Sequence, residues 1–108
     1  MLKNITVSGS KEFIKFYRKL EEDSLKHRLD TAIDFLKKNP SSGDRIKANL
    51  WPAKYIKKYC INNLYRYSLG SNWRIIYTLV GQSDKINCVI LEILDHKEYD
   101  DLFGYKTS

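Results

Sequence analysis

The chain has 108 residues, of which 43% are apolar and 30% are charged, and it carries a net charge of +6. This length suits a single domain over residues 1–108, and this composition excludes an intrinsically disordered chain. We expect no membrane contact and a cytoplasmic protein, because no apolar run could cross a bilayer and no signal-peptide stretch opens the sequence.

The first part of the chain predicts a strand followed by a helical hairpin. Residues 5–7 alternate between apolar and polar, as in a short strand, and Ser8-Gly9-Ser10 then breaks the pattern and supplies a helix N-cap. Apolar residues recur at helical spacing over residues 13–20, and again in a second segment that starts at a cap near Asp23 and stops before Pro40. Two antiparallel helices therefore follow the first strand.

The second part predicts three strands and two short helices. Residues 53–59 suit a turn or two of helix after a proline, and residues 64–69 and 73–80 predict a hairpin. Residues 86–94 are apolar on both alternating sets, as in a central strand covered on both faces, and residues 96–103 predict a short helix closed by a glycine. We expect an α+β fold in the order β-α-α-β-β-β, with the helical hairpin packed on a small antiparallel sheet and a short helical element at the C-terminus.

The basic charge is concentrated in the middle of the chain. Residues 45–83 carry seven basic and no acidic side chains, whereas residues 84–108 carry three basic and six acidic ones. A field of this sign favours nucleic acid or an acidic protein as a partner. The same middle segment holds seven aromatic residues, which either stack on bases or fill the core: Trp51, Tyr55, Tyr59, Tyr65, Tyr67, Trp73 and Tyr77.

The sequence gives no support for a metal or a cofactor. Cys60 and Cys88 lie far apart, and neither His27 nor His96 joins them at the spacing of metal ligands, so we interpret both cysteines as buried thiols. No phosphate-binding glycine loop, CxxC pair, HExxH or GxSxG motif occurs. The chain is left with metal-free chemistry or with binding alone.

Arg74 and His96 are the candidates for metal-free chemistry on RNA, in which the 2′-hydroxyl attacks the adjacent phosphate while other groups move protons and hold charge. Arg74 interrupts an apolar strand, so its guanidinium must reach either a functional surface or a carboxylate, for which Glu92 and Asp95 are available. His96 follows the last long strand, where a histidine is either structural or catalytic.

Most of the chain, in the order β-α-α-β-β-β, resembles the RelE/ParE toxin superfamily. The resemblance is most specific over residues 63–105, which include Leu64-Tyr65-Arg66-Tyr67-Ser68-Leu69, Trp73-Arg74-Ile75-Ile76-Tyr77 and Ile93-Leu94-Asp95-His96-Lys97-Glu98-Tyr99. The segment Asp101-Leu102-Phe103-Gly104 is similar to the ending of the YafQ-type toxins within that superfamily.

This resemblance implies the toxin of a type II toxin–antitoxin system, an mRNA interferase that cuts mRNA on the ribosome without a metal or cofactor. Its implied partners are a cognate antitoxin, mRNA and the ribosome, and its implied state is a monomer or a toxin–antitoxin complex. Arg74 matches the arginine that contacts the scissile phosphate, and His96 matches the general acid or base. Tyr99, or Phe103 in its place, matches the aromatic residue that stacks on or orients the substrate.

Around this site we expect a set of RNA-binding side chains. The cationic ones would dock the RNA backbone and the aromatic ones, together with Tyr99, would stack on bases. The set comprises Lys54, Lys57, Lys58 and Arg66, with Tyr65 and Tyr67.

The alternative is a binding protein without catalysis, either a gyrase inhibitor of the ParE branch or a degenerate toxin homologue. Acidic residues surround His96, and they would either favour its protonated form or bind a basic segment of a partner: Asp95, Glu98, Asp100 and Asp101. A nuclease requires His96 and Arg74 to open onto one concave surface. In a binding protein Arg74 would pair with Glu92 or Asp95 and leave no cavity beside His96.

Overall fold

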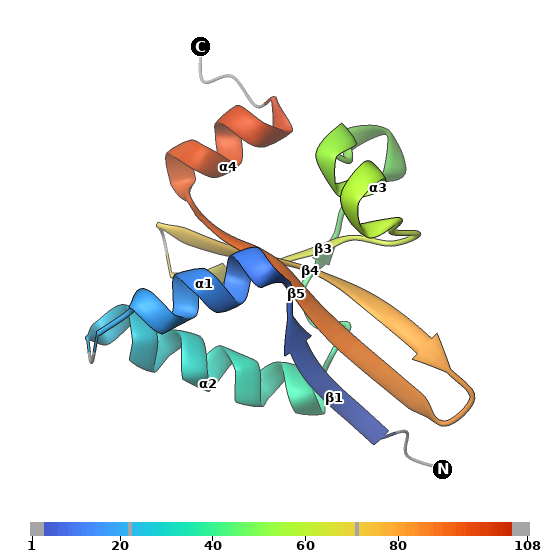
Figure 1. The fold of residues 1–108 in the computed structure, drawn as a ribbon, viewed down its shortest axis with the longest axis horizontal. Coiled ribbons are helices and arrows are strands. Elements are labelled where there is room, and N and C mark those ends of the chain that lie inside the picture. The colour runs from blue at the N-terminus through green and yellow to red at the C-terminus, as the bar shows by residue number, and fades with distance from the viewer. Residues whose placement is uncertain (1–3, 22, 71, 105–108) are drawn as a thin grey trace.

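A five-stranded sheet organises the fold (Figure 1), in a computed structural model that describes residues 4–21, 23–70 and 72–104. The strands lie in the order β1-β5-β4-β3-β2. They are β1 (Asn4–Gly9), β2 (Asp44–Arg45), β3 (Tyr65–Leu69), β4 (Trp73–Gln82) and β5 (Lys85–Asp95). The helices are α1 (Lys11–Lys19), α2 (Ser24–Lys38), α3 (Ala53–Tyr59) and α4 (His96–Phe103), with a 3-10 turn at Ala48–Leu50.

The expected α+β class and element order are confirmed, but the sheet is mixed rather than wholly antiparallel. β1 runs parallel to β5, while the other neighbouring strands are antiparallel. Alternation along a strand predicts which side chains share a face, but it does not identify the strand that pairs with it or the direction of that strand. The parallel pairing of β1 with β5 could therefore not be deduced. The sequence also missed β2, whose two residues form a strand only because they pair with Arg66 and Tyr65 of β3.

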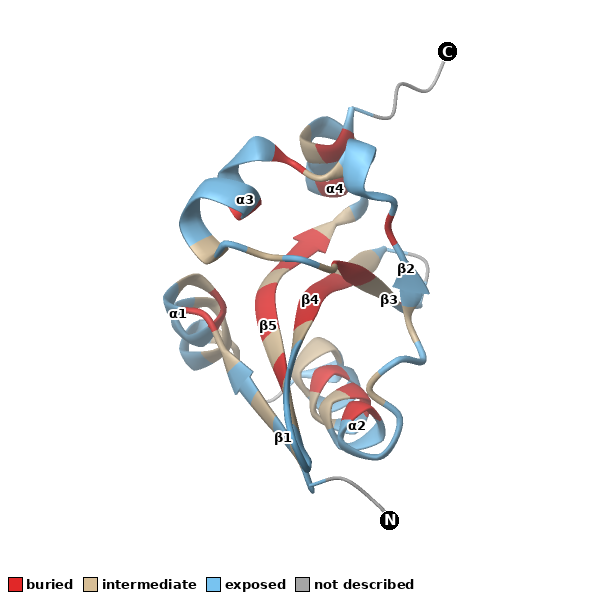
Figure 2. Ribbon diagram, turned by 90° about the vertical axis from the view of Figure 1, so that its right-hand side faces the viewer, coloured by how far each residue is buried: buried red, intermediate tan, exposed pale blue. Residues whose placement is uncertain are grey.

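Each face of the sheet has its own apolar cluster. On one face, side chains from α1 and α2 pack with strand residues; among these are Phe13, Leu29, Leu36, Ile75, Tyr77, Ile90 and Ile93. On the other face, α3 and α4 cover a second set, which includes Tyr55, Leu64, Ile76, Leu91, Leu94, Tyr99 and Phe103. Figure 2 shows the buried residues concentrated in β4 and β5, as expected for central strands covered on both sides.

A bulge in β5 decides which residues of that strand reach each cluster. Ile76 of β4 pairs with Glu92, whereas the next residue, Tyr77, pairs with Ile90, so Leu91 is the extra residue. Ile90 contributes to the cluster under α1 and α2, and Leu91 to the cluster under α3 and α4. Because two residues face one across the bulge, the alternation shifts by one position at this point.

The expectation of two buried thiols is correct for Cys88 and wrong for Cys60. Cys88 is fully buried, which raises its pKa to about 12, whereas Cys60 is exposed. Cys60 ends α3 in the left-handed conformation with φ of 51°, so it lies at a helix terminus and not on the packed face. Within the described ranges, no helix is long and apolar enough to cross a membrane.

Ser10 joins β1, α1 and β5 and should therefore be costly to replace. Its hydroxyl accepts the amide of Phe13 at 3.0 Å, caps α1 and donates to the carbonyl of Leu91 in a buried position. We expect Ser10→Ala to lower the free energy of unfolding by about 1–2 kcal/mol, because a cap and a buried carbonyl both lose their partner. Urea denaturation measures this, with the exposed Ser41→Ala as control. A loss equal to that of the control would contradict the assignment.

Candidate functional site

A cavity of about 260 Å³ lies where β2, β3 and β4 meet the beginning of α4. It brings together four of the candidate catalytic and RNA-binding residues, namely Arg66, Arg74, His96 and Tyr99. Three further residues complete its lining: Asp44, Ser68 and Asp100. Four separate elements of the chain therefore supply one concave polar surface.

Strand pairing explains why the two arginines share this surface. Ser68 of β3 lies directly opposite Arg74 of β4, and Arg66 lies two residues before Ser68 on the same strand. Residues two apart on a strand, and residues directly opposite on neighbouring strands, point to the same side of a sheet. Both guanidinium groups consequently project to the face that α4 covers.

Arg74 forms no ion pair among the described residues. Its Nη1 donates to the carbonyl oxygen of Trp73 at 3.1 Å and to that of Gly70 at 3.5 Å. Glu92 instead accepts from the Tyr55 hydroxyl at 2.6 Å and from Lys54 Nζ at 2.7 Å. Glu92, one of the two carboxylates that the sequence offered as a partner for Arg74, is therefore bound by α3.

Asp95, the other candidate partner of Arg74, is used at the start of α4. Its side chain accepts the amide of Glu98 at 2.8 Å, and the Glu98 carboxylate accepts the amide of Asp95 at 3.0 Å, which forms a capping box. This cap fixes the point where β5 turns into α4. His96 follows at once as the first residue of the helix.

His96 and Asp100 form a pair on the cavity side of α4. The Nε2 atom of His96 lies 3.2 Å from Oδ2 of Asp100, and the imidazole is 59% exposed. The spacing of four residues places both on one face of the helix, and Tyr99 lies beside them at a spacing of three from His96. One helical face therefore presents three of the residues that line the cavity.

Tyr99 holds Arg66. Its ring is 3% exposed and stacks on Phe103 with 4.6 Å between ring centroids, and its hydroxyl accepts from Arg66 Nη1 at 2.6 Å. This hydrogen bond raises the pKa of Arg66, and Asp44 Oδ2 lies 3.5 Å from Nε of the same guanidinium. Because the ring belongs to the core, the geometry suits Tyr99 to orienting a cation and not to stacking on a base.

The chain has the fold of a YoeB/ParE toxin. It is similar to the solved structure of the YoeB/ParE toxin from Agrobacterium tumefaciens, with a TM-score of 0.58 and 10% sequence identity, over 84% of this chain and 98% of that one. No protein-family model and no curated protein sequence matches the chain. The resemblance inferred from the sequence is thereby confirmed for the fold.

The lysines of α3 lie outside the cavity of this toxin fold, and two of them are paired. Lys54 binds Glu92 of β5, and Lys58 Nζ binds Glu12 of α1 at 2.6 Å. Lys57 is exposed on the same helix. Two of the three lysines in the expected basic patch are therefore neutralised by glutamates that lie far away in the sequence.

Tyr65 and Tyr67 point to the opposite face of the sheet from Arg66. Tyr65 is 9% exposed and stacks on Tyr77 with 5.3 Å between centroids, while Tyr67 lies against Phe35 of α2 at 6.0 Å. Neither ring lines the cavity. In a strand, Tyr65 and Tyr67 must point to the face opposite Arg66. The expected RNA-binding surface with all three side chains was therefore inconsistent with the strand predicted over residues 64–69.

Two lining residues, Asp44 and Ser68, were missed in the sequence, whereas Asp100 was among the acidic residues noted around His96. Ser68 was detectable, because it lies two residues after Arg66 in a predicted strand. Asp44 carried no local signal, since only the long-range pairing of β2 with β3 brings it to the cavity. Among the described residues, no group of three or more His, Cys, Asp and Glu side chains could hold a metal ion.

The contact between α3 and α1 predicts how the stability of the fold depends on pH in the acid range. Hydrogen bonds from Lys58 and Tyr59 lower the pKa of Glu12 to about 2 from 4.5. A carboxyl whose pKa is lower in the folded state stabilises the fold above pH 4.5 and loses that contribution as the pH falls toward 2. We expect Lys58→Met to flatten the decline of the unfolding free energy over this interval, as measured by urea denaturation at a series of pH values.

Lys57→Met is the matched control for this measurement, because it removes the same charge from an exposed position on the same helix. Its acid limb should follow that of the unmodified protein. Equal flattening by both variants would mean that general charge repulsion, and not the Lys58–Glu12 pair, causes the effect.

Proposed function

We propose that the protein is the toxin of a type II toxin–antitoxin system and that it cuts mRNA on the ribosome, in the cytoplasm, without a metal. The observation that carries this proposal is the cavity shared by Arg74 and His96, in which Arg74 has no carboxylate partner among the described residues. The likeness in fold to a YoeB/ParE toxin supports the toxin class and, with it, the need for an antitoxin.

In the proposed reaction the ribose 2′-oxygen attacks the adjacent phosphorus and the bond from phosphorus to the 5′-oxygen breaks. The 2′-hydroxyl loses its proton to a base, and the leaving 5′-oxygen gains one from an acid, so the products are a 2′,3′-cyclic phosphate and a 5′-hydroxyl. Negative charge accumulates on the nonbridging oxygens in between. Arg74, with a planar fork suited to two phosphate oxygens, stabilises that charge.

His96 transfers one of the protons. Its exposed imidazole opens on the cavity, and Asp100 holds the ring through Nε2 at 3.2 Å, which leaves Nδ1 for the substrate. A second proton-transfer group is also needed, and Asp44 is the other carboxylate that lines the cavity. Arg66, held by Tyr99, docks the neighbouring phosphate, and Lys57 on α3 adds a docking cation farther out.

A binding function without catalysis is the second candidate, and the outer surface of α4 favours it. Glu98 and Asp101 are exposed there, close to His96, and would attract a basic protein segment more than an RNA backbone. A gyrase inhibitor or a degenerate toxin would use this surface and need no cavity.

Ribosome-bound mRNA separates the two candidates. We expect His96→Ala and Arg74→Ala each to slow cleavage on translating ribosomes by about a hundredfold or more, the usual cost of losing proton transfer or charge stabilisation. Mapping of mRNA 5′ ends measures the cuts. His27→Ala, at an exposed position on α2, is the matched histidine control. Growth arrest that persists in both variants without RNA cuts would refute the nuclease.

Tyr99→Phe distinguishes orientation of Arg66 from stacking on a base. The variant keeps the ring on Phe103 and removes only the hydroxyl that accepts from Arg66. If Tyr99 orients Arg66, cleavage should fall by about tenfold to a hundredfold, since a hydrogen bond to a charged group is worth about 1.5–3 kcal/mol. Single-turnover cleavage measures the rate, and a variant as active as the unmodified protein would favour stacking.

A further inference from the structure

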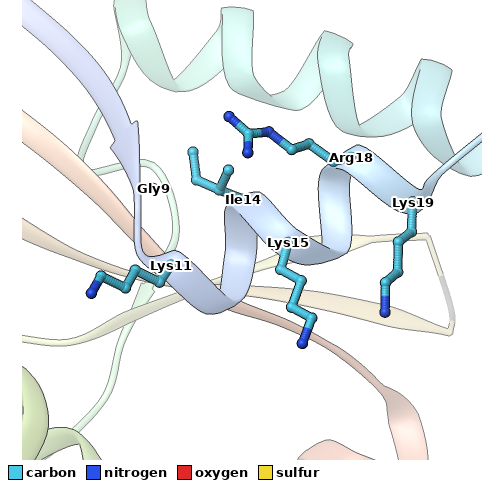
Figure 3. Close-up of a pocket in the computed structure, with 6 residues that line it drawn as sticks. All are labelled: Gly9, Lys11, Ile14, Lys15, Arg18 and Lys19. Carbon is cyan, nitrogen blue, oxygen red and sulfur yellow. The ribbon is translucent and has the colours of Figure 1, made fainter.

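The cavity along α1 offers positive charge without an aromatic surface. It has a volume of about 420 Å³ and is lined by four basic residues, with Gly9 and Ile14: Lys11, Lys15, Arg18 and Lys19. In Figure 3, the three lysines extend from one side of α1, and Arg18 lies on the other side, toward α2. This cavity shares no described lining residue with the candidate catalytic cavity.

A second cationic cavity lies beside β2 and combines charge with an aromatic ring. Its volume is about 290 Å³, and it forms where β2 leads into the 3-10 turn at Ala48–Leu50. The described residues that line it include no acidic side chain: Arg45, Ile46, Lys47, Ala48, Trp51 and Asn62. Two cations and an indole therefore meet in one place.

The indole of Trp51 is fixed in this cavity. Its Nε1 donates to the carbonyl oxygen of Ile46 at 2.9 Å, and the ring packs against the apolar cluster under α3 and α4 while it stays only half-buried. Because the N–H already has a partner, the ring offers a ligand its π surface and not a donor. Such a ring suits stacking on a nucleobase, since every base has a π face.

The two cations of this cavity are not neutralised. No ion pair between described residues uses Arg45 or Lys47. The guanidinium carbon of Arg45 lies 5.9 Å from the centre of the Tyr65 ring, which holds the side chain without cancelling its charge. Lys47 is exposed at the start of the 3-10 turn. Both cations are therefore available to phosphate.

β2 connects this cavity to the candidate catalytic cavity. Asp44, the first residue of β2, lines the catalytic cavity, and the next residue, Arg45, lines the second one. Consecutive residues of a strand point to opposite faces of a sheet, so the two cavities open on either side of β2. Since β2 is the last strand of the described sheet, a single RNA strand can pass over this edge from one cavity to the other.

We propose that the second cavity is a subsite for one nucleotide of the mRNA next to the cut, in which the base stacks on Trp51 while Arg45 and Lys47 contact the adjoining phosphates. This Trp51 subsite rests on the proposed function for the identity of the RNA. Stacking and charge act on any base, so the subsite holds the strand in place for cleavage without selecting its sequence.

An acidic peptide is the competing occupant of the Trp51 subsite. Its carboxylates would pair with Arg45 and Lys47, but they would gain nothing from Trp51, because the face of an aromatic ring carries negative partial charge. A nucleotide has a flat base joined to its phosphate and uses all three side chains. The α1 cavity, which has cations alone, provides a control for attraction by charge.

The probe for this proposal is 2′-O-methyl oligouridine of about six nucleotides, which lacks the 2′-hydroxyl needed for cleavage. It is compared with an abasic strand that has the same number of phosphates and with a polyglutamate peptide. Fluorine NMR of the full chain labelled with 5-fluorotryptophan locates the contact, because the chain has two tryptophans. We expect oligouridine to shift the resonance of Trp51 more than that of Trp73, which packs on Phe16. The abasic strand and the peptide should shift Trp51 far less.

Trp51→Ala tests the stacking contact. We expect the affinity for oligouridine, measured by the fluorescence anisotropy of a labelled strand, to fall about fivefold to a hundredfold, the cost of one stacked base. Trp51→Phe keeps an aromatic ring, loses the hydrogen bond to Ile46 and should retain most of the affinity. An equal loss in both variants would mean that the hydrogen bond, and not the ring face, supports binding.

Arg45→Met combined with Lys47→Met tests the phosphate contacts. We expect the slope of log affinity against log salt concentration to become shallower by about 1.4, since each phosphate contact on a single strand contributes about 0.7. Lys15→Met combined with Arg18→Met removes the same charge from the α1 cavity and should leave the slope nearly unchanged. Equal flattening by both pairs would mean that the strand follows net charge alone.

Abasic residues placed in the mRNA beside the cut test the occupant on the ribosome. They should slow cleavage by the unmodified protein and have little further effect on Trp51→Ala, because both changes remove the same stacking contact. Cleavage by the unmodified protein that does not respond to these abasic residues would exclude mRNA from the subsite.

The proposal is overturned by an unshifted Trp51 resonance, by equal binding of the abasic strand or the peptide, or by any of the contrary results named for the variants and the abasic mRNA. Binding and cleavage are read separately. A protein that binds oligouridine at Trp51 and fails to cut mRNA would refute the proposed nuclease alone. One that cuts mRNA and leaves the Trp51 resonance unshifted would refute the subsite alone.

Discussion

The bulge at Leu91 is the constraint on which the arrangement of the cavity depends. Upstream of it, Cys88 and Ile90 face α1 and α2, and downstream Leu94 faces α3 and α4. With strict alternation, Glu92 would share the face of Ile90, whereas the bulge brings it to Lys54 and Tyr55. One inserted residue thus places Glu92 on the face of Arg74, where Lys54 and Tyr55 of α3 bind it, and sets the phase in which β5 enters α4.

Local patterns predicted the elements well, because caps and periodicity act within a few residues. Asp23 caps α2, and Gly104 closes α4 as expected. Arg74 was also identified locally, as a charged residue inside an apolar strand, and His96 as a histidine directly after a strand. Their common cavity was not predictable from spacing, since it requires β4 and the end of β5 to be neighbours.

Long-range pairing accounts for what the sequence did not predict. Asp44 and the parallel position of β1 depend on contacts between segments far apart in the chain. The charge composition of the middle segment also does not show which of its cations form ion pairs. Lys54 and Lys58 are bound by distant glutamates, whereas the basic residues of α1, in a part of the chain with nearly balanced charge, line the largest of the cavities described above.

The way Arg74 is held has a consequence for the energetics of anion capture. Backbone carbonyl oxygens of Gly70 and Trp73, fixed by the hairpin between β3 and β4, hold the guanidinium with partial charges only. In the proposed reaction, a phosphate that reaches Arg74 would break no salt bridge with the described residues, and the cation would need little reorganisation as charge develops on the phosphorus. The hairpin between β3 and β4 preorganises the guanidinium of Arg74, because folding already supplies part of the free energy needed to position this charge.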